Sequence, residues 1–148
     1  MQAKKILFPT DFSTVSDDAL RFAAMLARDT GATLHIVHVE EPPTAYGGGE
    51  TYYGVPEPDT GALNRMLEAV KPDDPKVAYE QHLLIGNPAD EVIEYAKREQ
   101  VDMIVMASHG RTGVLRFLMG SVAERVVREA PCPVVTVKAH QTTLPAGR

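Results

Sequence analysis

Apolar residues follow two different spacings along this chain. Short runs dominated by apolar and β-branched residues are typical of buried strands, and apolar residues that recur every three or four positions are typical of amphipathic helices. The runs predict strands around residues 6–8, 33–39, 77–84, 102–107 and 133–137. The longer spacing predicts helices over residues 17–30, 62–70, 89–100 and 122–130.

Strands and helices alternate from the first predicted element to the last. This order predicts an α/β fold, an open five-stranded parallel sheet with helices on both faces, because right-handed crossovers return each strand to the same sheet. Ser16 is expected to cap the first helix and Gly31 to end it. Residues 40–62, with four prolines and five glycines, predict a long mobile loop. We expect one domain over residues 1–139 and a polar tail over 140–148.

Composition narrows the classes of function. The net charge of −5 disfavours a nucleic-acid partner. No apolar run is long enough for a membrane span or a signal-peptide core, and the single cysteine, Cys132, fits a reducing cytoplasm. We therefore expect a cytoplasmic protein in which Cys132 serves packing.

Histidines and methionines carry weaker signals. His35 and His38 are three residues apart on one predicted strand, so they point to opposite faces and cannot share a metal. No spacing typical of structural zinc occurs in the sequence. Three methionines are expected in the core: Met25, Met103 and Met106.

Two loops follow strands where the strand order is expected to reverse, which is where open parallel sheets bind ligands. They are PTDFS at 9–13 and ASHGRTGVLRFLMGS at 107–121. The second loop places glycines between a buried strand and a helix start, where bare backbone and unpaired N–H groups suit a phosphate. It is not a Walker loop, because no Gly-Lys-Ser/Thr follows the glycines.

Several of these residues have a plainer alternative. Ser121 and Glu124 form the S-x-x-E pattern of a capping box, so Ser121 either caps its helix or contacts phosphate. Asp11 either caps the first helix or binds the ligand. Arg116 is expected to be a solvated loop charge, and His109 is expected to lack an orienting partner.

The two loops and the closing CPVV together match a family pattern. That pattern is Gly, two residues, Gly, nine residues, then Gly followed by Ser or Thr. Here Gly110, Gly120 and Ser121 keep the spacing, and Ala107 replaces the first glycine. On these residues the chain resembles the nucleotide-binding universal stress proteins over nearly its whole length. The resemblance implies a Rossmann-like fold of the adenine nucleotide alpha hydrolase kind, and binding of ATP with Mg²⁺ held through the phosphates.

The resemblance also implies roles by position. Asp11 would meet adenosine, Val39 would line the adenine pocket and Ala107 would lie under the ribose. The backbone N–H groups of the motif, Gly120 among them, would face the phosphates. The predicted nucleotide-binding residues are Pro9, Thr10, Asp11, Val39, Ala107, His109, Gly110, Arg111, Gly113, Gly120, Ser121 and Val122.

Three functions are compatible with these residues. The first is an ATP-binding regulatory or stress module with at most slow hydrolysis and no catalytic residues. The alternatives are an adenylating or ATP-hydrolysing enzyme of the same fold and a dimeric interaction module without nucleotide, toward which Ala107 leans. The last strand has little charge to protect its edge, which predicts a homodimer through Val134, Val135 and Val137.

Overall fold

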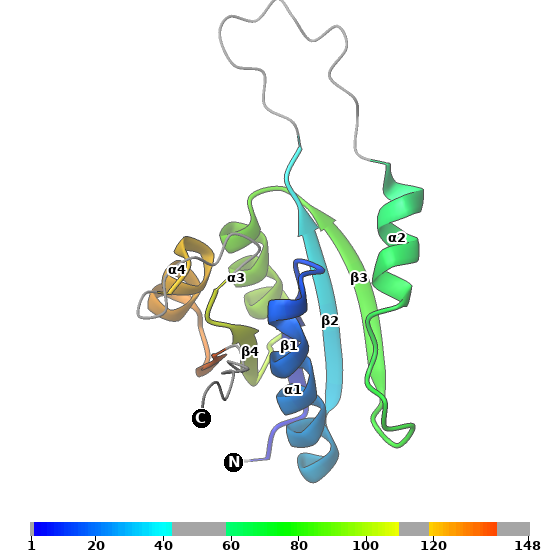
Figure 1. Ribbon diagram of the computed structural model, residues 1–148. Coiled ribbons are helices and arrows are strands. Elements are labelled where there is room, and N and C mark those ends of the chain that lie inside the picture. The colour runs from blue at the N-terminus through cyan, green and yellow to red at the C-terminus, as the bar shows by residue number, and fades with distance from the viewer. Residues whose placement is uncertain (1, 43–58, 110–118, 139–148) are drawn as a thin grey trace, which may run out of the picture.

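The strands form one parallel sheet in the computed structural model, which describes residues 2–42, 59–109 and 119–138 (Figure 1). The order across the sheet is β3-β2-β1-β4-β5, and each neighbouring pair is parallel. The predicted α/β fold with five parallel strands is therefore confirmed. The strands are β1 (Lys5–Pro9), β2 (Thr33–Glu40), β3 (Tyr79–Ile85), β4 (Met103–Ala107) and β5 (Val134–Val137).

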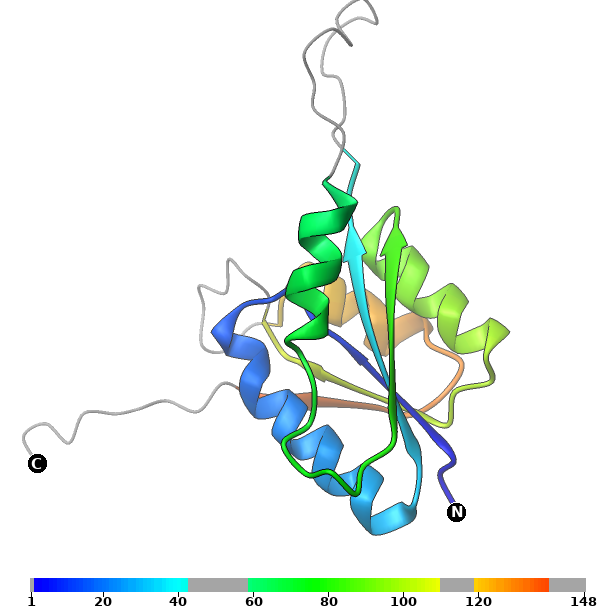
Figure 2. The same cartoon turned by 90° about the vertical axis from the view of Figure 1, so that its right-hand side faces the viewer.

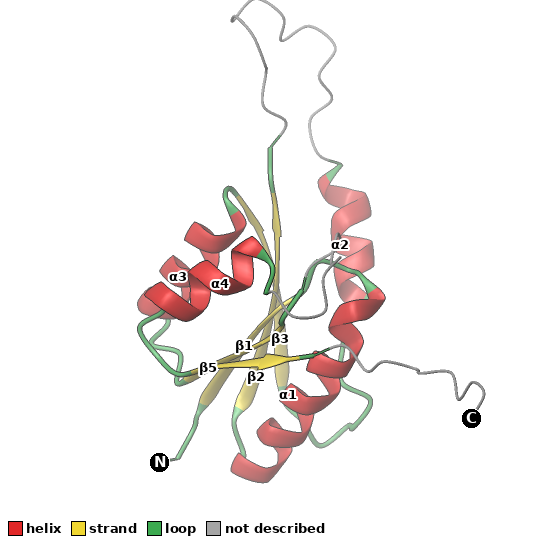
Figure 3. Cartoon of the chain, turned by 60° about the vertical axis from the view of Figure 1, so that its left-hand side comes forward, coloured by secondary structure: helices red, strands yellow, loops and turns green. Residues whose placement is uncertain are grey.

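Helices cover both faces of the sheet, as the alternating element order requires. Figures 2 and 3 show α1 and α2 on one side and α3 and α4 on the other. No helix among the described residues combines the length and hydropathy needed to cross a bilayer. The helices are α1 (Asp17–Thr30), α2 (Thr60–Glu68), α3 (Pro88–Arg98) and α4 (Ser121–Glu129), with a 3₁₀ turn, η1 (Thr14–Ser16), before α1.

Each face of the sheet has its own hydrophobic core, because successive strand residues point to opposite faces. In β1, Ile6 and Phe8 pack with the alanines of α1, whereas Leu7 packs with α3 and α4. All three side chains are almost completely buried. This two-sided burial explains why the strands read as continuous apolar runs.

The ends of α1 follow the sequence signals in part. Gly31 ends the helix in the left-handed conformation at φ 76°, as expected of a glycine stop. Ser16 occupies the N-cap position, but its hydroxyl donates to the carbonyl of Ser13 at 2.7 Å rather than accepting from a helix N–H. The predicted side-chain cap is therefore absent from this helix end.

The core predictions hold for two of the three methionines. Met106 is buried and Met103 packs against the core. The prediction for Met25 was wrong, because Met25 is 50% exposed. α1 turns its alanines, such as Ala23, toward the sheet, and a residue two positions further along a helix points roughly to the opposite side. Cys132 packs against the core on the face of the sheet that α3 and α4 cover, and burial raises the pKa of its thiol.

The predicted loop over 40–62 is shorter at both ends. β2 continues to Glu40 and α2 begins at Thr60. Residues 43–58 lie outside the described part of the chain, as does the predicted tail over 140–148.

Candidate functional site

A pocket of about 500 Å³ lies at the carboxyl ends of β1 and β4, where the strand order reverses. This is the place in open parallel sheets where ligands bind. Nine of the predicted site residues line it: Pro9, Thr10, Asp11, Val39, Ala107, His109, Gly120, Ser121 and Val122. The other three, Gly110, Arg111 and Gly113, lie outside the described residues, as does Arg116.

The loop after β1 is held by its own hydrogen bonds. The Thr10 hydroxyl accepts from the Phe12 N–H at 3.0 Å, and Asp11 Oδ1 accepts from the N–H and the hydroxyl of Ser13 at 3.0 and 2.5 Å. Phe12 adopts a left-handed φ of 67°, which is uncommon for a residue with a side chain. The alternative that Asp11 caps the first helix is wrong, because Ser13 and Ser16 hold the N-cap positions of η1 and α1.

His38 on β2 holds this loop in place, a contact that the sequence did not predict. Its Nδ1 donates to the carbonyl of Thr10 at 2.7 Å, and its Nε2 faces Glu40 Oε1 at 2.9 Å. The Phe12 ring stacks on the imidazole with 4.0 Å between ring centroids. His38 is only 2% exposed. The spacing of His38 and Glu40, two residues apart on one strand, was the available signal for their pairing.

On the other side of the pocket, β4 leads into Ser108 and His109. Ser108 is buried, and its hydroxyl lies 3.0 Å from His109 Nδ1. The prediction that His109 lacks an orienting partner was therefore wrong. His109 Nε2 is buried and has no hydrogen-bond partner among the described residues. Since an unsatisfied buried nitrogen costs about 1–3 kcal/mol, this atom is suited to a polar group of a ligand.

The start of α4 lies one residue earlier than a capping box requires. Gly120 is the N-cap, at φ −64° and ψ 160°, and Ser121 is the first helical residue. The capping-box alternative for Ser121 is therefore wrong. A first-turn hydroxyl that does not hold the N-cap position is available to a ligand.

The backbone donors at this helix end also differ from expectation. The N–H of Gly120 donates to the Ser108 carbonyl at 2.8 Å, so it is not the phosphate donor that the motif implied. The first N–H bonded within α4 is that of Glu124, to the Gly120 carbonyl at 2.9 Å. The N–H groups of Ser121, Val122 and Ala123 precede it and have no acceptor within the helix.

Charge is divided across the pocket. The carboxylates that line it are Asp11, Glu40 and Glu41, and the positive end of the α4 dipole lies at Ser121. Hydroxyl and amine donors of a ligand suit the carboxylates, whereas an anionic group suits the helix end. Ala107 ends β4 between these two ends and has no positive φ, so the alanine strains no backbone there.

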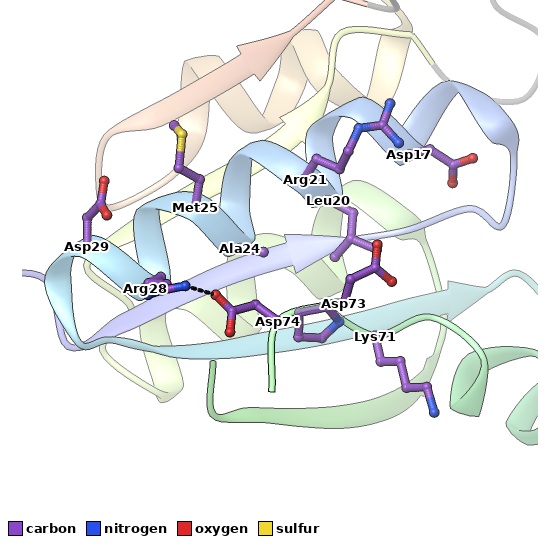
Figure 4. A pocket seen from close by; sticks show the side chains of 11 residues that line it. Asp17, Leu20, Arg21, Ala24, Met25, Arg28, Asp29, Lys71, Asp73 and Asp74 are labelled. Atoms are coloured by element: carbon purple, nitrogen blue, oxygen red, sulfur yellow. Dashed lines mark hydrogen bonds and ion pairs between the residues drawn. The ribbon is translucent and has the colours of Figure 1, made fainter. Parts of the chain in front are cut away.

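A larger hollow of about 740 Å³ lies along α1 and the segment that follows α2 (Figure 4). Its rim is charged on both sides, and Arg28 Nη1 bonds Asp74 Oδ2 at 2.5 Å across it. None of the predicted site residues that the structure describes lines this hollow, and it does not contain the start of α4. The carboxyl-end pocket is therefore the better candidate site, although it is smaller.

Comparison with known proteins places this geometry in a family. The model of the Universal stress protein family matches residues 2–138. Universal stress protein MJ0531 of Methanocaldococcus jannaschii is 35% identical over 91% of this chain and 82% of its own. Universal stress protein UspA of Lactobacillus plantarum has a similar structure, with a TM-score of 0.73 at 23% identity, over 93% of this chain and 99% of its own. A universal stress protein of Archaeoglobus fulgidus in complex with dAMP gives a TM-score of 0.62 at 26% identity, over 93% of this chain and all of its own.

Proposed function

This chain belongs to the universal stress protein family, and from that premise we propose that it is an ATP-binding regulatory module. The observation that carries the proposal is the pocket shared by Asp11 and the first turn of α4. A carboxylate and a helix N-terminus on opposite sides of one pocket match the two ends of a nucleotide.

The nucleotide would lie with its adenosine at the β1 and β2 ends. Asp11 and Thr10 stand there among the polar groups, and Val39 supplies an apolar surface for the base. The phosphates would lie at α4, where the N–H groups of Ser121, Val122 and Ala123 and the Ser121 hydroxyl can donate. The Archaeoglobus relative in complex with dAMP supports an adenine nucleotide as the ligand.

Mg²⁺ would accompany ATP through the phosphate oxygens. The residues present fit an ion held by the phosphates alone, because the lining carboxylates, Asp11, Glu40 and Glu41, belong to the adenosine side of the pocket. No described residue of the pocket carries an arginine or lysine charge. An ion bound to the phosphates would supply positive charge on that side.

Regulation suits this pocket better than fast turnover. Efficient phosphoryl transfer needs a positioned nucleophile and charge stabilisation at the γ-phosphate. Asp11 lies at the adenosine end, and His109 is oriented by a serine rather than by a carboxylate. We therefore propose a cytoplasmic stress module in which ATP occupancy, and not ATP hydrolysis, carries the signal.

A homodimer through β5 belongs to the same proposal. β5 pairs only with β4 in the described sheet, so its other side is an edge. The carbonyl of Pro133 accepts from Ile104 in β4, and that of Val137 accepts from Ser108 just after β4. The backbone groups of Val134 and Thr136 therefore point outward. Two such edges can pair across a two-fold axis.

Mass spectrometry of small molecules released from denatured protein tests the proposal directly, and calorimetry with ATP gives the affinity. We expect a micromolar dissociation constant, about −8 kcal/mol. Gly120→Val should lose most of this affinity, because a branched side chain would stand where the phosphate needs bare backbone. The change should cause no backbone strain, because a φ of −64° suits any residue. Gly61→Val in α2 is the matched control, since a Cβ there meets only ordinary contacts. No released nucleotide and no ATP binding would favour the interaction module instead.

A further inference from the structure

Two strands bring metal-ligating side chains together away from the nucleotide pocket. His35 on β2 pairs in register with Glu80 on β3, and His82 lies two residues further along β3 on the same face. None of the three lines either hollow described above. β3 is the outer strand of the sheet next to β2, so the cluster lies near its edge.

The donor atoms of this cluster already converge. Glu80 Oε1 lies 3.0 Å from His82 Nε2 and 3.8 Å from His35 Nδ1, and one donor atom from each residue lies within 4.8 Å of the others. Ligands at about 2.0–2.2 Å from a tetrahedral zinc ion are about 3.3 Å from one another. The donors therefore need shifts of only about 1 Å to reach such an arrangement. Glu80 and His82 have exposed side chains that can make these shifts.

His35 supplies the fixed member of the cluster. It is only 3% exposed, so its ring is held in place by the surrounding core. The Tyr95 hydroxyl on α3 lies 2.7 Å from His35 Nδ1. In the tautomer in which the phenol donates this hydrogen bond, Nδ1 carries the lone pair that a metal requires.

From this geometry we infer a site for a divalent transition metal of the zinc type at His35, Glu80 and His82. Two imidazoles and one carboxylate form a donor set that zinc uses in proteins, with water completing the coordination. The ion displaces Tyr95 from Nδ1 and joins β2 to β3 through side chains. His35 and His38 remain on opposite faces, so the ligands come from neighbouring strands rather than from one.

The bound ion has a structural consequence. β3 has only β2 as its neighbour in the described sheet, and α2 covers one of its faces. A cross-link between the two strands holds the edge strand in register and stabilises the folded state by mass action. The site is independent of ATP, since no residue is shared with the pocket.

Cobalt and zinc titrations of the full chain, freed of metal and nucleotide, test this inference. We expect one Co²⁺ per chain with the intense visible absorption of tetrahedral coordination, displaced by Zn²⁺. His82→Gln and Glu80→Gln should each weaken binding by at least about tenfold. Both side chains are about half exposed, so these variants should disturb the fold less than a change at the buried His35. Zinc should raise the melting temperature of the unaltered chain and leave that of His82→Gln unchanged.

Glu68→Gln is the matched control, since it removes an exposed carboxylate of α2 outside the cluster and should leave cobalt binding as it was. The inference is overturned if the unaltered chain binds no cobalt or zinc in the micromolar range. It is equally overturned if His82→Gln and Glu80→Gln bind as tightly as the unaltered chain, because the ion then lies elsewhere.

Discussion

Replacement of Ser121 by alanine separates two roles of one hydroxyl group. Ser121 is the first residue of α4, while Gly120 holds the N-cap. Removal of the hydroxyl therefore breaks no cap. Alanine is also the stronger helix former, by about 0.5 kcal/mol. We expect the free energy of unfolding of Ser121→Ala to equal that of the unaltered chain within about 0.5 kcal/mol, or to exceed it slightly.

The effect on ATP should be much larger. A hydrogen bond to a charged group such as phosphate contributes about 1.5–3 kcal/mol. At 1.4 kcal/mol for each factor of ten, the dissociation constant should rise by about 10- to 150-fold. Binding should not vanish, because the backbone N–H groups of Ser121, Val122 and Ala123 remain in the variant.

Calorimetry with ATP and urea unfolding of the same preparations measure both quantities. Ser121→Thr keeps the hydroxyl and should keep most of the affinity. Thr60→Ala changes the first residue of α2 in the same way, outside the pocket, and should leave ATP binding unchanged. The opposite outcome, unchanged ATP affinity with about 1 kcal/mol lost from unfolding, would show that the hydroxyl caps α4 and would refute its assignment to phosphate.

Stability, assembly and turnover each give one further prediction. Burial lowers the pKa of His35 from 6.5, so at pH values below 6.5 the unfolded chain binds more protons than the folded chain, and the free energy of unfolding should decrease as the pH is lowered. Urea unfolding should show a smaller decrease for His35→Asn. Thr136→Pro removes an outward N–H of β5 and should convert a dimer to a monomer in light scattering, and a monomeric unaltered chain would contradict the edge pairing. ATP turnover should lie far below about 10 s⁻¹ and should not depend on His109, which a phosphate-release assay of His109→Ala checks.

Local sequence signals were sufficient for the elements of this fold. The β-branched run of β2 and the glycine stop at Gly31 act within a few residues, and the structure follows both. Met25 shows the limit of such signals. Apolar residues occur on more than one face of α1, so the sequence does not decide which face is buried. Packing against the sheet selects the face that carries the alanines.

The pocket was predictable in position but not in its bonds. The alternation of elements predicts a ligand at the carboxyl ends of parallel strands, and nine predicted residues meet where β1 and β4 end and the strand order reverses. The hydrogen bond from the Gly120 N–H to the Ser108 carbonyl links residues twelve apart and fixes where α4 begins. The local S-x-x-E pattern carries no information about that bond, and it therefore predicted Ser121 rather than Gly120 as the N-cap.

Pairing between strands accounts for what sequence reasoning missed. His35 and His82 are far apart in the chain and become neighbours only through the register of β2 and β3. His38 likewise reaches Thr10 because β1 and β2 are adjacent. Contacts of this kind depend on strand order and register together, and a shift of one residue would reverse the face of every side chain.

Preorganisation is concentrated in the loop after β1. The left-handed backbone of Phe12 costs about 1–3 kcal/mol, and the bonds of Thr10 and Asp11 with the stacked His38 ring offset that cost before any ligand arrives. A loop held in this way loses little further entropy on binding. The β1 side is therefore suited to a ligand of fixed shape, such as the nucleoside of the proposed ATP. The helix end at Ser121 supplies charge complementarity, which depends little on the shape of the anion. This division favours selection for the adenosine over selection for the length of the phosphate chain.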